Sequence, residues 1–159
     1  MIDDQIAEKF GNKVRVRVCG LCWKDGKLLM VNHSGLNKGD FWSPPGGGVE
    51  FGQKMEDTLK SEFLEETGIL VEPRQHLFTC ELIRGPLHAV ELFFEAKYVN
   101  GELRTGTDPE LDDMSQIITE VRFMGINEIM ALNPQSRHGI FERVTSPGEV
   151  KNLVGFYSI

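Results

Sequence analysis

Three glutamates near the end of a helix-like segment are the residues best suited to chemistry. The segment from Lys54 to Thr67 contains no glycine or proline, and Gly68 follows it where a helix commonly stops. At about 100° per residue of helix, Glu62, Glu65 and Glu66 share one side. Neighbouring carboxylates repel one another and lose hydration when buried, so cations usually neutralise such a cluster. The spacing predicts a site for Mg²⁺ or Mn²⁺, although glutamate pairs are also frequent on solvated helix faces.

A run of three glycines lies just upstream of this helix, at positions 46–48. Residues without side chains let backbone groups approach a ligand closely and adopt conformations closed to other residues. The surrounding stretch 32–48 is rich in glycine, asparagine, serine and proline, which predicts a loop without regular structure. Phe41 and Trp42 lie within it and are costly to leave in water, so we expect the loop to be packed.

Taken together, residues 47–69 resemble the Nudix box, G-x5-E-x7-R-E-U-x-E-E-x-G-U, in which U is a bulky aliphatic residue. Gly47 matches the first glycine of the pattern. The matching positions toward the end of the box are Glu62, Glu65, Glu66, Gly68 and Ile69. Several fixed spacings coincide, so the match is specific.

The resemblance implies a single Nudix domain over residues 1–159, folded as an α/β/α sandwich with a central mixed β-sheet. It implies a cytoplasmic pyrophosphohydrolase that acts on a small nucleotide substrate: a nucleotide sugar, ADP-ribose or a nucleoside triphosphate. Glu62, Glu65 and Glu66 would hold Mg²⁺ or Mn²⁺, helped by a backbone carbonyl at Gly46 or Gly47. Water activated by the metal and a carboxylate would attack phosphorus. Many members of the family form dimers, so a homodimer is a further expectation.

Departures from the box motivate a second hypothesis. Gln53 stands where the family has glutamate, Ser61 stands where it has arginine, and Phe63 replaces an aliphatic residue. A neutral hydrogen bond between Gln53 and Ser61 could replace the family's ion pair. The alternative is a catalytically weakened domain that binds a nucleotide derivative as a sensor. A protein-interaction domain with a merely structural glutamate cluster is the third interpretation.

Residues outside the box could complete the site. Arg15 and Arg17 alternate with valines in a strand pattern and could contact a substrate phosphate, or form a solvated face. Glu91 shares a strand face with Phe93 and could line the site. Glu120 and the acidic stretch 108–113 are candidates for an extra metal ligand or the general base, or for a solvated loop. Stacking of Phe41, Trp42 or Phe78 on a base competes with core packing. The histidines His33, His88 and His138 lack metal-like spacing, so we interpret them as surface or capped residues.

Hydrophobic alternation and turn residues predict the elements. The strands expected are 14–23, 27–31, 69–71, 77–83, 90–99 and 121–124, and the helices are 54–67 and 126–132. In the first strand, the valines at 14, 16 and 18 are expected to form the buried face. Residues 108–116 are predicted to form a mobile loop, and residues 134–159 have no clear periodicity.

Composition narrows the class of protein. A net charge of −7 and a pI near 5.1 argue against a nucleic-acid partner, which normally needs clustered basic residues. No apolar run approaches the roughly 20 residues of a membrane span, so no membrane association is expected. The 3 cysteines leave one unpaired if any disulfide forms, which suits a reducing compartment. Cys19 and Cys22 would point to opposite faces of a strand and are interpreted as buried thiols.

Overall fold

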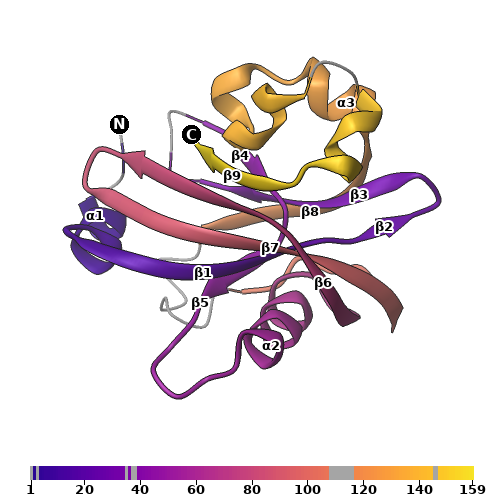
Figure 1. Ribbon diagram of the computed structural model, residues 1–159, viewed down its shortest axis with the longest axis horizontal. Helices are drawn as coiled ribbons and strands as arrows, with labels where there is room; N and C mark the ends of the chain where they lie inside the picture. Colours follow the sequence, from indigo (N-terminus) through magenta and orange to yellow (C-terminus); the bar gives the residue numbers. More distant parts are fainter. Residues whose placement is uncertain (1, 3, 35, 37–38, 108–116, 145–146) are drawn as a thin grey trace.

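The computed structural model describes the whole chain except residues 1, 3, 35, 37–38, 108–116 and 145–146. Two β-sheets lie between helices on opposite sides (Figure 1). The first has strand order β5-β1-β7-β6-β9, and in the second β3 pairs with β2, β4 and β8. The pairs β1·β7 and β6·β9 are parallel and the other named pairs are antiparallel. This confirms the predicted α/β fold with a mixed sheet.

The strands are β1 (Lys13–Leu21), β2 (Trp23–Lys24), β3 (Lys27–His33), β4 (Phe41–Ser43), β5 (Gly46–Gly48), β6 (Ile69–Arg84), β7 (Leu87–Gly101), β8 (Ile118–Gly125) and β9 (Gly155–Ser158). The α-helices are α1 (Asp4–Phe10), α2 (Met55–Thr67) and α3 (Ile126–Ala131). Three short 3-10 helices follow: η1 (Pro134–Ser136), η2 (Gly139–Arg143) and η3 (Pro147–Asn152). In the part of the chain that is described, no helix is both long and apolar enough to cross a membrane.

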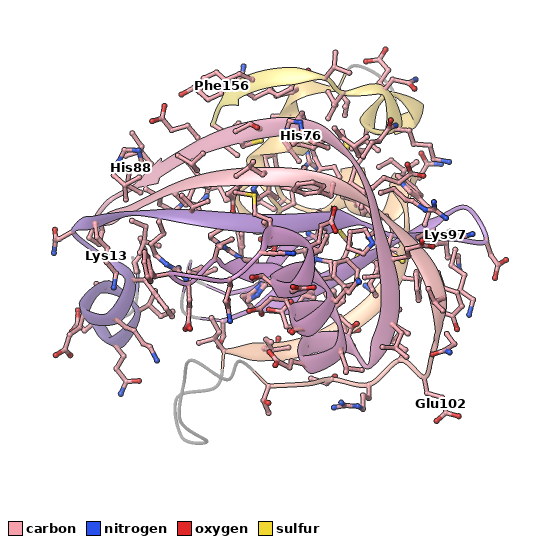
Figure 2. The ribbon with its side chains drawn as sticks, turned by 60° about the horizontal axis from the view of Figure 1, so that its bottom comes forward. Lys13, His76, His88, Lys97, Glu102 and Phe156 are labelled. Carbon is pink, nitrogen blue, oxygen red and sulfur yellow. The ribbon has the colours of Figure 1, made fainter. Side chains whose placement is uncertain are left out.

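Two hydrophobic clusters hold the layers together. On one side of the first sheet, α2 packs Leu59 and Phe63 against Val18 of β1. On the other side, Phe78 and Phe93 stack with ring centroids 4.6 Å apart and join the larger cluster, which includes the α3 and 3-10 segments. Figure 2 shows α2 crossing this sheet, with Lys13 and His88 toward one end and Lys97 toward the other.

The cysteines belong to these clusters and form no disulfide. Cys19 lies in the larger cluster and Cys22 in the cluster beneath α2, so the two point to opposite faces as predicted. Cys19, Cys22 and Cys80 are all buried and free. Their interpretation as structural thiols is confirmed.

Helix α2 is fixed most firmly at its C-terminal end. Gly68 adopts a φ of 74°, which glycine accepts without steric cost, and its N–H donates to the Leu64 carbonyl over 3.0 Å. The segment after β7 then satisfies further carbonyls that a helix end leaves unpaired. The N–H of Gly106 donates to Glu66 over 2.8 Å, and that of Arg104 donates to Thr67 over 2.9 Å. The turn of α2 that carries the glutamates is therefore held in place.

Several sequence expectations need correction. The stretch 32–48 contains the short strands β4 and β5, because backbone pairing with β3 and β1 fixes residues of weak intrinsic preference. The strands expected at 69–71 and 77–83 are one strand, β6, bent by register irregularities near Pro73 and His76. Helix α1, the 3-10 helices and β9 were not expected. Residues 108–116, expected to be a mobile loop, lie outside the described residues.

The buried face of β1 was also predicted wrongly in part. Val14 and Val16 are 61% and 40% exposed, whereas Val18 is buried. Helix α2 covers only the Val18 end of this face. The opposite face, with Arg15 and Arg17, is half-buried because it lines a pocket. Alternation located the strand but did not show which of its faces is covered.

Candidate active site

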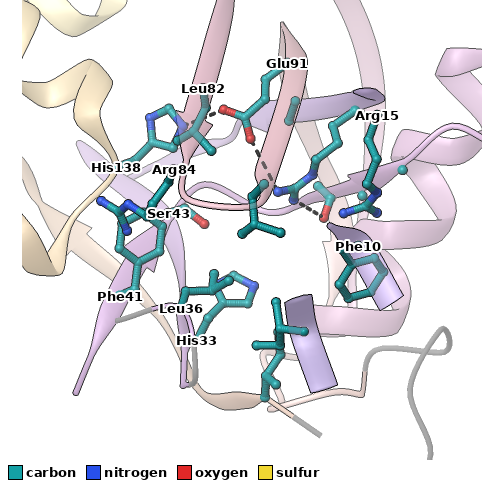
Figure 3. Close-up of a pocket in the computed structure, with 18 of the residues that line it drawn as sticks. Phe10, Arg15, His33, Leu36, Phe41, Ser43, Leu82, Arg84, Glu91 and His138 are labelled. Carbon is teal, nitrogen blue, oxygen red and sulfur yellow. Dashed lines mark hydrogen bonds and ion pairs between the residues drawn. The ribbon is translucent and has the colours of Figure 1, made fainter. Parts of the chain in front are cut away.

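A pocket lies between the two sheets, and residues of β5 and α1 form part of its lining (Figure 3). Its empty volume, including the part open to solvent, is about 950 Å³. The lining residues with charged, polar or no side chains are Arg15, Arg17, His33, Ser43, Gly46, Gly47, Gly48, Glu62, Glu66, Arg84, His88, Glu91 and His138. The pocket therefore combines carboxylates, guanidinium groups and imidazoles in one concave surface.

Two of the three predicted glutamates reach this pocket. Glu62 is half-buried, and Glu66 is only 3% exposed. One carboxylate oxygen of Glu66, Oε2, accepts a hydrogen bond from the N–H of Gly46 over 3.3 Å. Glu65 is half-buried and is not among the residues that line the pocket. The shared helix side thus brings Glu62 and Glu66 to the pocket, whereas Glu65 is not part of its lining.

The glycines of β5 make this approach sterically feasible. A Cβ on Gly47 would overlap the carboxylate of Glu62, with Oε2 only 2.6 Å away. A Cβ on Gly46 would overlap the backbone of β1 and come within 2.9 Å of the sulfur of Cys19. Since β5 is the edge strand beside β1, its bare backbone lets the side chains of α2 reach the pocket around the edge of the sheet.

A chain of buried polar contacts connects the far wall of the pocket to β5. Nε2 of His138 lies 2.7 Å from Oε2 of Glu91, and Oε1 of Glu91 lies 3.4 Å from Nη1 of Arg17. Nη2 of Arg17 donates to the Gly46 carbonyl over 3.3 Å (Figure 3). Nδ1 of His138 accepts the N–H of Ile140 over 3.2 Å, so the ring proton belongs on Nε2 and is donated to Glu91.

These contacts set the charge of Glu91. Burial alone would raise its pKa, but the hydrogen bond from His138, together with the charges of Arg17 and Arg15, lowers it to about 2. Glu91 is 2% exposed and remains ionised at neutral pH. A carboxylate this weakly basic is unsuited to removing a proton from water. Its contacts instead hold Arg17 in position.

The side chain of His33, in contrast to that of Glu91, is uncharged. Burial and the charge of Arg17 lower its pKa to about 4, so the imidazole is neutral at physiological pH. The side chain is 8% exposed, and Nδ1 has no hydrogen-bond partner among the described residues. The Nε atom of Arg17 is also buried without a partner within this part of the chain. Both orphaned atoms belong to residues that line the pocket.

The remaining candidate residues from the sequence differ in whether they line the pocket. Arg15, Arg17 and Glu91 line the pocket. Glu120 is exposed on β8, 3.6 Å from Arg122, and is not part of the lining. The acidic candidates at 108–113 lie outside the described residues. Of the aromatic candidates, Phe41 lines the pocket, whereas Trp42 and Phe78 belong to the larger core cluster.

The hydrogen bond expected between Gln53 and Ser61 is not formed. Oε1 of Gln53 accepts from the hydroxyl of Thr58 over 3.1 Å and from the N–H of Glu50 over 3.4 Å. Ser61 is exposed. Gln53 therefore ties the loop to the first turn of α2, because Thr58 is nearer than Ser61 to the point where the loop enters the helix.

The interpretation of the histidines as surface or capped residues missed their place in the pocket. His33 and His138 are buried in the pocket wall, and His88 is half-buried and also lines the pocket. His138 lies in the segment without periodicity, so only the tertiary structure places it against Glu91. His33 ends β3, and alternation in that apolar strand gives no sign that its side chain faces a cavity.

The carboxylate and carbonyl oxygens in this pocket suit a hard divalent cation. Among the described residues, no group of three or more His, Cys, Asp or Glu side chains is arranged to hold a metal ion. Magnesium, however, commonly uses one or two carboxylates and completes its octahedron with water and substrate phosphate. Glu62 and Glu66 provide such carboxylates, and the bare β5 backbone beside them offers carbonyl oxygens. The residues present are therefore compatible with Mg²⁺ or Mn²⁺.

Comparison with known proteins identifies the family. The NUDIX domain model matches residues 11–144, and the chain belongs to this family. An ADP-ribose pyrophosphatase of Methanocaldococcus jannaschii is 28% identical over 119 residues, which cover 74% of this chain and 65% of that protein. An RNA pyrophosphohydrolase of Bartonella clarridgeiae is 36% identical over 50 residues, covering 31% and 29% of the two chains. The chain thus spans less than two thirds of the length of either relative.

Solved structures show the same fold. A NUDIX hydrolase from Nitrosomonas europaea matches with a TM-score of 0.69 at 20% identity, covering 89% of this chain and 93% of that one. The MutT protein of Methanosarcina mazei Go1 matches with a TM-score of 0.65 at 19% identity, covering 82% and 91%. At these identities the likeness concerns the fold alone.

Proposed function

We propose that this protein hydrolyses the pyrophosphate bond of a nucleoside diphosphate derivative with the help of Mg²⁺ or Mn²⁺. The observation that carries the proposal is the meeting of Glu62 and Glu66 with Arg15 and Arg17 in one pocket. Carboxylates suit a divalent cation, and guanidinium groups suit phosphate oxygens, so the combination favours phosphate chemistry. The relative named ADP-ribose pyrophosphatase supports this substrate class.

In this proposal the metal is held by Glu62, Glu66 and a backbone carbonyl at Gly46 or Gly47, and Glu65 on the same turn of α2 is a further ligand or base. When bound, the metal neutralises phosphate charge and lowers the pKa of a coordinated water. The hydrogen bond from Gly46 fixes the orientation of the Glu66 carboxylate. The carbonyl of Gly46 is the better candidate, because it faces the pocket, where Arg17 donates to it. Gly47 instead pairs with Val18 between the backbone bonds of Gly20 to Pro45 and of Val49 to Val16, so its carbonyl faces β1.

Arg17 is the stronger candidate for a phosphate contact. Its two terminal nitrogens contact Glu91 and Gly46, which holds the guanidinium plane in one orientation. Its Nε is without a partner among the residues described and can donate to a phosphate oxygen. Arg15 lies two residues away on the same face of β1, about 7 Å along the strand, where it can contact a second phosphate.

Product release from a panel of compounds tests this function. We would assay nucleotide sugars, ADP-ribose, dinucleoside polyphosphates and nucleoside triphosphates with Mg²⁺ or Mn²⁺. Glu66→Gln should lower kcat by about 100-fold, corresponding to about 3 kcal/mol of transition-state stabilisation. Glu56→Gln, on the exposed first turn of α2, is the matched control and should keep full activity. Turnover that survives Glu66→Gln would contradict the proposal.

The alternative function is a sensor that binds a nucleotide derivative without hydrolysing it. The exposure of Ser61 supports it, because the family's arginine position carries no charge here to act beside Glu62. A sensor would show thermal stabilisation by one compound of the panel and no products. A protein-interaction domain would show neither products nor stabilisation by a divalent ion. Cytoplasmic location and a homodimer remain predictions from the sequence.

A further inference from the structure

We infer that the apolar part of the pocket binds the heteroaromatic base of the substrate, with His33 as the residue that hydrogen-bonds the base. This inference rests on the proposed function, because it assumes a nucleotide derivative. The outer chamber is defined as the space beside His33 lined by Ile6, Phe10, Leu36, Phe41, Leu82 and Leu87. Helix α1, the end of the β6–β7 hairpin, Leu36 and Phe41 of β4 all contribute to it.

The register of the first sheet sets the outer chamber apart from the glutamates. Cys19 pairs with Gly46, and two residues earlier Arg17 pairs with Glu91. Two residues earlier again, Arg15 pairs with Ala89, which also pairs with Leu82 of the outer chamber. At about 3.3 Å per residue, the row of Leu82 lies roughly 13 Å along β1 from the row of Gly46. A pyrophosphate and a pentose fit between these rows, which leaves the base in the outer chamber.

Nδ1 of His33 provides a recognition point that has no hydrogen-bond partner in the part of the chain that the structure describes. Figure 3 shows its ring pointing into the pocket, with Phe41 on one side and Phe10 on the other. Leaving a buried nitrogen such as Nδ1 unsatisfied costs free energy that a bound ligand can recover. A neutral imidazole offers one donor and one acceptor rather than a positive charge. This matches the N–H groups and ring nitrogens of a base edge better than it matches an anionic phosphate.

Two arginine-backed aromatic rings form the walls. Cζ of Arg15 lies 4.2 Å from the centroid of the Phe10 ring, and Cζ of Arg84 lies 4.9 Å from that of Phe41. Aromatic rings and guanidinium planes both stack on nucleobases. A sugar would need a polar partner for most of its hydroxyl groups, and the described lining contains no Asp, Asn or Gln. The outer chamber therefore suits a base better than a hexose.

Calorimetric binding of products, without metal and without turnover, tests the inference. We would titrate AMP, GMP, CMP and UMP, and ribose 5-phosphate as the ligand that lacks a base. At least one nucleoside monophosphate should bind about 10-fold more tightly than ribose 5-phosphate. His33→Leu should remove most of this advantage, whereas His33→Gln, which retains hydrogen-bonding groups, should restore part of it. His76→Leu, on the exposed part of β6, is the control and should change nothing.

The outcomes separate this inference from the proposed function. Base-dependent binding that is lost in His33→Leu but accompanied by no turnover of any panel compound would support the base site and contradict the hydrolase. Turnover with no nucleoside monophosphate bound more tightly than ribose 5-phosphate would overturn the base site and leave the hydrolase standing. Unchanged base preference in a folded His33→Leu variant, checked by its melting temperature, would also overturn the inference.

Discussion

Replacing Gly47 by alanine should uncouple activity from stability. The added methyl group would lie 2.6 Å from Oε2 of Glu62 and closer still to other carboxylate atoms, whereas ordinary contact begins at 3.4 Å. The carboxylate must therefore move by roughly 1 Å, and a displacement of that size in a catalytic group can cost about 100-fold in rate. The corresponding increase in the barrier is about 2.7 kcal/mol.

Stability should respond far less to Gly47→Ala. Gly47 is not among the residues with positive φ, so alanine fits its backbone conformation. Alanine also restricts the unfolded chain, which offsets part of the cost of moving a half-buried side chain. We expect the free energy of unfolding to change by no more than about 1 kcal/mol.

The assay compares kcat and the free energy of unfolding with those of a matched control. Gly125→Ala adds a methyl group whose nearest neighbour, Oε1 of Glu128, is 3.6 Å away, and it lies outside the pocket. A 100-fold loss of kcat in Gly47→Ala, with near-native values for Gly125→Ala, is the expected result. A Gly47→Ala enzyme that is folded and within about 3-fold of the parent kcat would refute the role given to the bare β5 backbone.

Three further predictions concern stability and metal. The pKa of Glu91 falls from 4.5 to about 2 on folding, so its ionised form contributes about 3 kcal/mol to the free energy of unfolding above pH 4.5, and this contribution is lost as the pH falls toward 2. In urea unfolding from pH 7 to pH 3, the difference in unfolding free energy between the parent and Glu91→Gln should shrink, and a constant difference would contradict this. Gly68→Ala should destabilise the protein by at least about 1 kcal/mol, because φ is 74° there and the added Cβ would overlap the Glu102 carbonyl. An unchanged melting temperature would argue against Gly68 as the C-terminal cap of α2. Chelation by EDTA should abolish turnover reversibly. Mg²⁺ at ten times its Kd should raise the free energy of unfolding by about 1.4 kcal/mol. Activity that persists in EDTA would count against the proposed metal.

The sequence predicted helix α2 more accurately than the pocket around it. The bounds of α2, the left-handed Gly68 and the convergence of Glu62 and Glu66 follow from local rules: helix preference, capping and periodicity. The position of Glu91 also followed from alternation. Such features depend on residues close together in the chain, where spacing carries the information.

The rest depended on contacts between distant segments. His138 reaches Glu91 across 47 residues of chain, and nothing in the spacing of either residue indicates the pairing. The prediction that the valines of β1 form one buried face was wrong in part, because the length of α2 decides how many of these valines are covered. Glycine spacing in 46–48 indicated a close approach, but the side chain that approaches is visible only once α2 is docked.

The two parts of the pocket come from different stretches of chain. Residues 46–66 supply the glutamates and the β5 backbone, whereas the outer chamber is built by α1, the end of β3, the β6–β7 hairpin and the side chains of Leu36 and Phe41. Under the proposed function, mutations in the outer chamber would change which compound is accepted without disturbing the reacting groups. Such a division makes the protein easy to diversify: relatives could acquire new preferences through the N-terminal helix and the hairpin while one unaltered reaction centre is inherited.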